Sequence, residues 1–481
     1  MFINGEWHEP AGREKMRVVN PATGEAFAEV PRGTKEDVDR ALEAAAQAFT
    51  QWKDSLPSER AALLEKARAI LLERLPDIAR LLTQEQGKPL REAEGELKAT
   101  AAALEYYARK TEEIGGEILP PKAKGLRNLI LKQPVGPVVA IGPWNYPVLL
   151  IAWKVAPALA AGCTVVVKPA SQTPLAVTEF IRCFAEAGAP KGVVNLLTGP
   201  GRELGEALIR HPLTAKVAFT GETETGREIM RAAADGIKRI TLELGGHCPL
   251  IVAADADLEA AVEGGVYRAF RNMGQICNSI NRIYVEEPVY DEFVEAFVQR
   301  TKKLRIANGL EEPDADLGPM IDEVAREKTR RHIQDAVAKG AKILYGGKEP
   351  EGEEYKRGYF FEPTVLTEVN HEMIVMTEET FGPVAPIMKV SSLEEAIDYA
   401  NRSIYGLVAY LYTQDLDKAL QTAEALEYGT IGINNVAGGE VEYPYGGWKQ
   451  SGLGIELSDY GLKEYLLVKH VRIRSLHYKG G

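Results

Sequence analysis

The feature of this sequence that most constrains its fold is a regular alternation of short β-branched runs and longer amphipathic stretches. Between residues 163 and 234, each apolar run is followed by a stretch whose apolar residues recur at helical spacing. The pairs are CTVVVKP with LAVTEFIRCFAEAG, VVNLLTG with RELGEALIRH, and KVAFTG with ETGREIMRAAA, and ITLELGGHCPLIVAA ends the block. This β–α–β order predicts a parallel sheet covered by helices.

A second alternating block extends from Ala256 to about Gly432. Its strand candidates are INRIYV, ILYGG, APIMKV, AYLYT and GTIGIN. A chain of 481 residues is too long for one ordinary hydrophobic core, so two or three domains are expected. We therefore predict an α/β protein of two domains, with a β-like excursion at Leu126–Pro134 and a separate tail after Lys463.

Helical patterns fill the segment from Lys35 to about Gly115. Thr34 and Asp37 have the spacing of a capping box, in which two side chains bond to backbone N–H groups at the start of a helix. Ser58 and Glu59 predict the start of a second helix. These helices precede the first strands of the alternating block.

The apolar segment Pro147–Val167 approaches the length of a membrane-spanning helix. Lys154 and Pro157 fall inside it, however, and Gly162 interrupts it. The β-branched run TVVVKP then has the composition of a strand of its own. A buried helix followed by a buried strand is the better interpretation, and no membrane partner is expected.

Composition excludes several classes of function. The net charge of −12 argues against nucleic acid as a partner, because phosphate binding needs clustered Lys and Arg. The four cysteines form no CxxC pair and the seven histidines are scattered, so neither a disulfide framework nor a metal site is expected. Reduced thiols, together with an opening MFINGEWHEP that lacks a leader pattern, favour the cytoplasm.

Three predicted strands end in residues that suggest chemistry, and the carboxyl ends of parallel strands are where such sheets bind ligands. The three segments are Gly142–Pro147, Lys168–Ser171 and Glu243–Gly246. Each has a structural explanation that is the more common one, as a turn, a solvated strand end or an edge charge. The glycine-rich stretches GPGRELG and FTGETETG are weak nucleotide fingerprints, because neither is GxGxxG.

Cys277 lies in RNMGQICNSINR, a stretch rich in amides. A lone cysteine in a chain of this length is most often a small buried core residue. Gly274 and Gln275 are poor core residues, and backbone donors near a thiol suit a thiolate nucleophile. At this point both interpretations of Cys277 stay open.

Seven collinear motifs together resemble the NAD(P)-dependent aldehyde dehydrogenase superfamily over essentially the whole chain. They are PWNYP, KPASQTP, FTGETETG, LELGG, FRNMGQICNSINR, EETFGPV and PYGGWKQSGLG. The 34 residues from Glu243 to Cys277 (277 − 243) also match the family pattern. The resemblance implies a Rossmann-like NAD(P)-binding domain (1–118 and 136–244), a second α/β catalytic domain (245–445) and a β-hairpin oligomerisation element (119–135 and 463–481), in a homodimer or homotetramer.

The resemblance implies catalytic roles for four residues. Cys277 would attack the aldehyde as a thiolate, giving a thiohemiacetal and then a thioester. The side-chain amide of Asn145 and the backbone N–H of Cys277 would form the oxyanion hole. Glu243 would activate the hydrolytic water. Lys154 matches a lysine that relays protons or positions the cofactor.

The resemblance also implies a cofactor site for NADP or NAD. Lys168 would bind the adenosine ribose, and Glu379 with Phe381 the nicotinamide ribose. Trp144, Gly221, Glu222 and Gly245 would line the same cleft. Ser171 stands where many NAD-preferring members carry a glutamate, so a 2′-phosphate meets less repulsion. Glu222 opposes the binding of NADP or NAD at this point, because a carboxylate beside a diphosphate is unfavourable. The prediction is that the enzyme uses both cofactors and favours NADP.

The aldehyde substrate is only bounded by the sequence. Arg271 stands six residues before Cys277, where succinate-semialdehyde dehydrogenases hold a distal carboxylate with an arginine. Those enzymes tend to carry a second arginine just before the lysine of the helix after PWN, and Trp153 stands at that position here. Lactaldehyde, glyceraldehyde and aliphatic aldehydes therefore stay open as substrates beside a semialdehyde. The residues expected to form the pocket wall and its aromatic entrance are Tyr146, Trp153, Ile276, Asn278 and Trp448.

Three alternatives stand beside a hydrolytic aldehyde dehydrogenase. A coenzyme A-acylating enzyme is disfavoured by Glu243, since such members commonly lack this base. A structural protein that keeps only the fold is disfavoured by intact Cys277 and Asn145. The family motif ELGGKSP appears here as ELGGHCP, which introduces His247. This histidine suggests a Cys–His hydrolase as the third alternative. That alternative is disfavoured, because it would leave the cofactor motifs unexplained.

Overall fold

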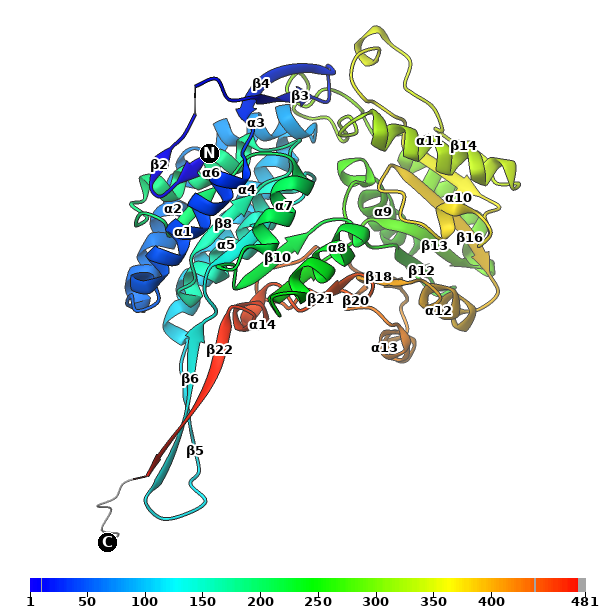
Figure 1. Cartoon of the computed structure of the whole chain (residues 1–481). Coiled ribbons are helices and arrows are strands. Elements are labelled where there is room, and N and C mark those ends of the chain that lie inside the picture. Colours follow the sequence, from blue (N-terminus) through cyan, green and yellow to red (C-terminus); the bar gives the residue numbers. More distant parts are fainter. Residues whose placement is uncertain (10, 437, 475–481) are drawn as a thin grey trace.

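The computed structural model describes residues 1–9, 11–436 and 438–474, and shows two α/β bodies with a projecting β arm (Figure 1). The first body is built on an eight-stranded sheet of order β2-β1-β9-β8-β7-β10-β11-β21. Its five central strands are parallel. They are β9 (Val194–Leu196), β8 (Val165–Lys168), β7 (Val138–Ile141), β10 (Lys216–Thr220) and β11 (Arg239–Glu243).

The edges of this sheet come from distant parts of the chain. β1 (Phe2–Ile3) pairs antiparallel with β9 and with β2 (Glu6–Trp7), and β21 (Gly452–Leu453) pairs antiparallel with β11. The segment after residue 445 therefore returns to the first sheet, beyond the end of the predicted catalytic domain. A two-stranded ribbon of β3 (Lys15–Asn20) and β4 (Glu25–Pro31) lies beside the sheet.

Alternate side chains of the central strands face two different helical layers, as the period of two in a strand requires. Val138 and Ala140 of β7 belong to the large core with α5 (Pro147–Ala161), whereas Val139 joins a smaller core with α1 (Lys35–Trp52). The other helices of this body are α2 (Pro57–Glu73), α3 (Leu75–Gln86), α4 (Leu90–Lys110), α6 (Leu175–Glu186), α7 (Gly201–Arg210), α8 (Thr223–Ala234) and the short α14 (Ser458–Lys463), which packs on α5.

The predicted helix starts are close to those observed. Thr34 and Asp37 form the capping box of α1, and the backbone N–H of Thr34 donates to Asp37 Oδ2 at 3.0 Å. α2 begins at Pro57, one residue before the predicted start, because Glu59 accepts from the backbone N–H of Leu56. The apolar segment is a helix, α5, followed by β8. In the part of the chain that the structure describes, no helix has the length and apolarity to cross a membrane.

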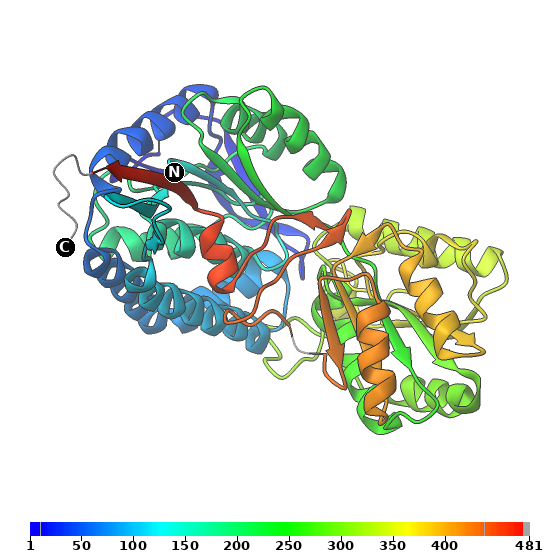
Figure 2. The ribbon, with the colours of Figure 1, turned by 90° about the horizontal axis from the view of Figure 1, so that it is seen from below.

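The second body has a seven-stranded sheet of order β14-β15-β16-β13-β12-β18-β19 (Figures 1 and 2). All neighbours are parallel except the edge strand β14. The strands are β12 (Cys248–Val252), β13 (Ile280–Glu286), β14 (Lys342–Tyr345), β15 (Thr364–Thr367), β16 (Val384–Val390), β18 (Val408–Tyr412) and β19 (Thr430–Ile433). The helices are α9 (Leu258–Phe270), α10 (Glu287–Thr301), α11 (Glu323–Ala338), α12 (Leu393–Asn401) and α13 (Leu416–Ala425).

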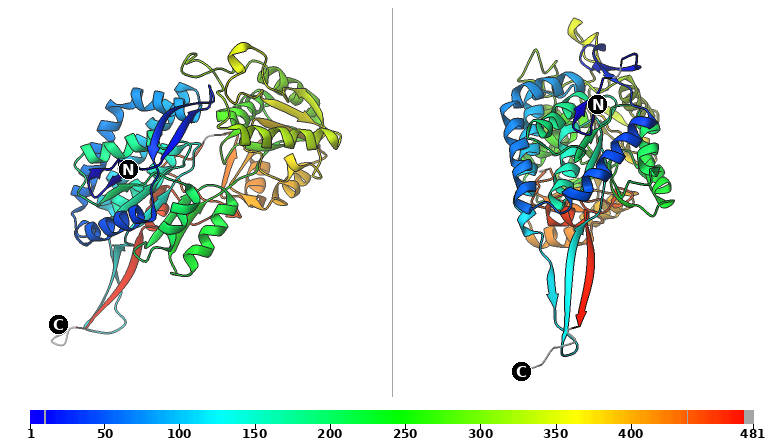
Figure 3. Two further views of the ribbon diagram at one scale, coloured as in Figure 1. Left: turned by 45° about the horizontal axis from the view of Figure 1, so that its top comes forward. Right: turned by 60° about the vertical axis from the view of Figure 1, so that its left-hand side comes forward.

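The arm is a three-stranded antiparallel sheet that projects from the first body (Figures 1 and 3). β6 (Leu126–Pro134) pairs along its whole length with β22 (Leu466–Arg474), and β5 (Glu117–Leu119) adds a short edge. The predicted excursion and the predicted tail are thus one element. The tail was expected over 463–481, of which 475–481 lie outside the described residues.

Candidate active site

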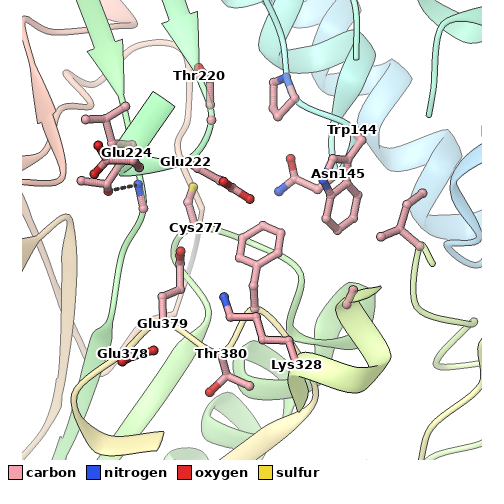
Figure 4. A pocket seen from close by; sticks show the side chains of 18 of the residues that line it. Trp144, Asn145, Thr220, Glu222, Glu224, Cys277, Lys328, Glu378, Glu379 and Thr380 are labelled. Atoms are coloured by element: carbon pink, nitrogen blue, oxygen red, sulfur yellow. Dashed lines mark hydrogen bonds between the residues drawn. The ribbon is translucent and has the colours of Figure 1, made fainter. Parts of the chain in front are cut away.

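A cavity of about 710 Å³ opens where the carboxyl ends of the first sheet meet the second body (Figure 4). Cys277 is one of the residues that line it. Eight of the predicted site residues line the cavity: Trp144, Asn145, Gly221, Glu222, Gly245, Cys277, Glu379 and Phe381. These eight residues come from five of the seven motifs, Gln172 adds a sixth, and both bodies contribute to the lining.

The loop that carries Cys277 has an unusual backbone. Asn272, Met273 and Gly274 have φ values of 48°, 59° and 68°, so three successive residues are left-handed. A Cβ at Gly274 would lie 2.3 Å from the carbonyl O of Gly382, so only glycine fits there. This turn ends α9 and presents the half-buried Cys277 to the cavity, and burial raises the pKa of its thiol to about 12.

Asn145 is held from three sides just before α5. Its side-chain Nδ2 donates to the carbonyl O of Gln275 at 2.9 Å, and its own carbonyl O accepts from Lys88 Nζ at 2.6 Å and from Asn272 Nδ2 at 3.4 Å. The amide points into the cavity on the same side as Cys277 (Figure 4). An amide N–H fixed beside a nucleophile can stabilise an oxyanion that forms there.

Glu243, the last residue of β11, is a buried carboxyl group without partners. Neither of its oxygens makes a hydrogen bond within the described chain. Burial, and then the neighbouring carboxylate of Glu456, raise its pKa well above the usual value. Native structures rarely leave a buried polar group unpaired without a functional reason.

Lys154 is completely buried on α5. Its Nζ donates to Glu456 Oε1 at 2.7 Å, to Thr220 Oγ1 at 2.6 Å and to the carbonyl O of Leu150 at 3.2 Å. Glu456 was not among the predicted residues, because it stands 302 positions from Lys154 and no local pattern connects them. The positive charge of Lys154 also opposes the rise in the pKa of Glu243.

The cavity lining also contains an aromatic pair and a carboxyl group. Trp144 and Phe381 meet edge to face at 5.5 Å between ring centroids. Glu379 Oε1 accepts from the backbone N–H of Gly246 at 2.9 Å, and burial raises its pKa to about 7. Lys328 of α11 also lines the cavity and was not predicted, since a lysine on an amphipathic helix looks like a solvated residue.

Glycines keep the strand–helix turns of the first body open. A Cβ at Gly221 would lie 2.4 Å from the ring of Phe219, and one at Gly245 would lie 2.8 Å from Glu379 Oε2. Glu222 caps the start of α8 without a side-chain hydrogen bond to the helix, and its carboxylate points into the cavity (Figure 4).

Lys168 and Ser171 do not line the cavity and lie beside it. Lys168 is buried, its Nζ donates to the carbonyl O of Pro169 at 2.8 Å, and burial lowers its pKa to about 8. No described carboxylate lies within 4.0 Å of this Nζ. Ser171 Oγ donates to the carbonyl O of Gly199 at 3.1 Å.

The residues predicted to hold the substrate also lie outside the cavity lining. Arg271 Nε donates to Glu92 Oε1 at 2.7 Å, and the hydroxyl of Tyr146 donates to the same carboxylate. Ile276 is buried, and Asn278 Oδ1 accepts from Arg268 Nη1 at 3.2 Å. The pairing of Arg271 with Glu92 was not anticipated from the sequence.

The three aromatic residues expected at an entrance have different surroundings. Trp153 is buried and packs at 5.6 Å on the ring of Tyr445, and Tyr146 is buried beneath Lys88. Trp448 is 55% exposed on β20 (Trp448–Lys449), which pairs with β17 (Tyr405–Gly406). Trp448 therefore lies on the surface of the described chain.

The Cys–His hydrolase alternative requires His247 to lie beside the thiol of Cys277, and the structure does not place it there. His247 is buried, its Nε2 lies 3.2 Å from the carbonyl O of Val375, and burial lowers its pKa well below the usual value. Among the described residues, the side chain within hydrogen-bonding distance of Cys277 Sγ is Tyr445, not His247.

Comparison with known proteins agrees with this geometry. The model of the aldehyde dehydrogenase family matches residues 7–471. The chain belongs to this family. It is 44% identical to a 3-sulfolactaldehyde dehydrogenase of Pseudomonas putida, with 98% of this chain and 96% of the relative covered, and 43% identical to the NADP(+) succinate-semialdehyde dehydrogenase of Escherichia coli, with 98% and 97% covered.

Solved structures give the same result. A succinate-semialdehyde dehydrogenase from Burkholderia pseudomallei superposes with a TM-score of 0.96 at 42% identity, over 98% of this chain and 97% of that chain. A lactaldehyde dehydrogenase superposes with a TM-score of 0.96 at 38% identity, over 99% of each chain. The chain is therefore an NAD(P)-dependent oxidoreductase that oxidises an aldehyde to a carboxylic acid through a cysteine thiohemiacetal and thioester.

Proposed function

We propose that Cys277 is the nucleophile, Asn145 and the backbone N–H of Cys277 the oxyanion donors, and Glu243 the hydrolytic base. The observation that carries this assignment is the convergence of Cys277 and the fixed amide of Asn145 in the lining of one cavity. The Cys277 thiolate adds to the aldehyde carbon, and the carbonyl oxygen becomes an oxyanion that the two N–H groups stabilise.

A bound nicotinamide would supply the hydride acceptor for this reaction. The residues present fit such a group, because the cavity has an aromatic pair at Trp144 and Phe381, a carboxyl at Glu379 and a turn kept open by Gly221. These residues would hold the nicotinamide half and its ribose. Lys168, with no described carboxylate as a partner, would bind the adenosine ribose.

Glu243 acts on the thioester that remains on Cys277. Its carboxylate takes a proton from a water molecule while the water oxygen attacks the acyl carbon, and the Cys277 thiolate leaves. Burial raises the pKa of Glu243 well above the usual value, which favours its neutral form, and water that reaches the carboxyl group would favour the carboxylate that acts as the base. Lys154 and Glu456, buried next to it, form the charged surroundings that modulate this pKa.

We infer dual cofactor use with NADP favoured. Ser171 brings no negative charge to the region of Lys168, so a 2′-phosphate would meet a cation and a hydroxyl there. Glu222 points into the cavity and would disfavour a nearby phosphate, which limits the preference. The ratio of kcat/KM with NADP to that with NAD measures this inference, and a ratio below one would contradict it.

We infer a small aldehyde with an anionic or hydroxyl group at its far end. Arg271 uses Nε on Glu92, while Nη1 and Nη2 make no hydrogen bond to any described residue. The relatives' names carry succinate, glutarate and sulfolactaldehyde, each with an acidic group. Trp153 supplies no second cation, so a neutral hydroxyaldehyde is the second candidate class.

One assay tests these assignments together. The enzyme is incubated with NAD or NADP and a panel of semialdehydes, hydroxyaldehydes and aliphatic aldehydes, with and without coenzyme A. We expect reduced nicotinamide and free acid without coenzyme A, and greatest kcat/KM for the acidic aldehydes. Dependence on coenzyme A would favour the acylating class instead, and absence of any reduced nicotinamide would refute the enzyme assignment.

We infer that the remaining predictions also hold: the domain limits given above, a homodimer or homotetramer, and a cytoplasmic location. The arm supports assembly, because β5 and β22 expose Ile118 (76%) and Val468 (72%) on a sheet with open edges. The four free thiols support a reducing compartment. Light scattering of the purified protein would give the subunit number, and a monomer would contradict the proposed assembly.

A further inference from the structure

The hydroxyl of Tyr445 lies beside the sulfur of Cys277, in a position that the proposed mechanism does not use. The distance from Tyr445 Oη to Cys277 Sγ is 3.7 Å, within the range for a hydrogen bond to sulfur. Among the described residues, no other side chain makes a hydrogen bond to this sulfur. The second thiol nearby, Cys248, donates instead to the backbone carbonyl of Cys277.

Tyr445 is held firmly in this position. Its backbone N–H donates to the carbonyl O of Glu456 at 2.9 Å, and the backbone N–H of Glu456 donates back at 2.7 Å. Its ring is buried and packs on Trp153 with 5.6 Å between centroids. A hydroxyl fixed by backbone bonds and ring packing loses little freedom when it bonds to a neighbouring group.

The other ionisable groups that face Cys277 disfavour a thiolate. Glu243 approaches from the end of β11 and Glu379 from the loop before β16, and both carboxylates raise the pKa of the thiol beyond the effect of burial. Lys154 is paired with Glu456, so its charge is largely neutralised. The Tyr445 hydroxyl is the side chain that acts in the opposite direction.

We propose that Tyr445 is a further catalytic residue, whose hydroxyl donates a hydrogen bond to the Cys277 sulfur and stabilises the thiolate before the aldehyde adds. This inference rests on the proposed role of Cys277 as nucleophile. The tyrosine keeps its proton throughout, because burial and the neighbouring Cys277 and Glu243 raise its pKa well above the usual value. The thiol proton leaves to water, and no bond to Tyr445 forms or breaks.

The test is the pH dependence of Cys277 alkylation by iodoacetamide, without cofactor or aldehyde, in the native enzyme and in Tyr445→Phe. A hydrogen bond to a charged group is worth enough to shift a pKa by about one unit, so alkylation should be about tenfold slower below the apparent pKa. The rate of Cys277→Ala is subtracted to remove the other three thiols, which are buried.

Tyr107→Phe is the matched control. Tyr107 is also a buried tyrosine with one hydroxyl bond, to the carbonyl O of Ser458 at 3.3 Å, and its loss should leave the alkylation profile unchanged. If phenylalanine impairs folding at position 445, Tyr445→Leu replaces it, since leucine also lacks the hydroxyl. An unchanged apparent pKa in a folded variant overturns the proposal.

The experiment distinguishes a failure of the Tyr445 proposal from a failure of the Cys277 assignment. Turnover that survives in Cys277→Ala would refute the nucleophile, whatever the alkylation shows. A shifted alkylation profile in Tyr445→Phe with a matching alkaline shift of kcat/KM would support both assignments. A shifted alkylation profile without any change in the kcat/KM profile would overturn the catalytic role of the tyrosine alone.

Discussion

Two regions of the first body bury carboxyl groups, and they treat them in opposite ways. In the layer of α3 and α4, Glu96 accepts from Lys88 Nζ at 2.5 Å and from the backbone N–H of Val148 at 2.9 Å, and Glu85 accepts from the N–H groups of Leu175 and Ala176, both at 2.8 Å. Near Cys277, Glu243 at the end of β11 is similarly buried, but neither oxygen has a hydrogen-bond partner in the described chain.

This difference separates a structural carboxyl from a chemical one. Glu85 and Glu96 satisfy the free N–H groups at the starts of α6 and α5, which helices leave unpaired. Glu243 leaves its lone pairs free for a substrate or a water molecule. Its charged form is destabilised in return, because no hydrogen bond compensates for its burial. Burial alone therefore does not identify a functional carboxyl; its missing partners do.

The largest expected effect separates the two regions by activity. Glu243→Gln removes the base but keeps the shape, so we expect one rapid turnover of reduced nicotinamide followed by a stall at the thioester, with steady-state kcat lower by at least about 10³-fold. Stopped-flow absorbance measures burst and steady state. Loss of the burst as well would show that Glu243 is also needed to activate Cys277.

The second expected effect is a loss of stability combined with a loss of the contact that holds the backbone of Asn145. Lys88→Met leaves Glu96 buried without its cation and removes the donor to the carbonyl O of Asn145, so we expect unfolding to require about 3–5 kcal/mol less, with a lower kcat. Urea unfolding and steady-state kinetics measure the two. The double variant Lys88→Met/Glu96→Gln should recover part of the stability, because no unpaired buried charge remains.

The smallest effect is a pH dependence of stability. Burial raises the pKa of Glu85 to about 8 in the folded protein, above its value of about 4.5 when unfolded. A group with a raised pKa contributes stability below the unfolded pKa and loses it as pH rises through the folded one. Unfolding free energy should therefore fall between about pH 4.5 and about pH 8, and the fall should be smaller in Glu85→Gln. An identical slope in both proteins would contradict it.

Regular patterns made much of this molecule predictable. The alternation of β-branched runs and amphipathic stretches predicted both sheets, because the hydrophobic periods of strands and helices depend on residues that are close together in the sequence. The motif around Cys277 predicted a polar setting for the thiol, and the sequence motifs at Asn145 and Glu379 led to the residues that line the cavity. These successes depend on local order.

What the sequence did not reveal depends on distance along the chain. Lys88 reaches the carbonyl O of Asn145 across 57 positions, Glu456 pairs with Lys154 across 302, and Tyr445 lies beside Cys277 across 168. No periodicity connects such positions, and each residue looks ordinary among its neighbours. Tertiary packing decides these contacts, so they become visible only in the folded chain.

The returning segment from Tyr445 to Leu466 has a consequence for how the chain can be cut. Within it, Tyr445 meets Cys277, Gly452 pairs with Glu243 and Glu456 bonds to Lys154, before β22 begins. Truncation ahead of this segment would remove the residues that contact Cys277, Glu243 and Lys154, together with strand β22 of the arm. The segment therefore completes both parts of the molecule, and a chain that ends before residue 445 should be catalytically inactive.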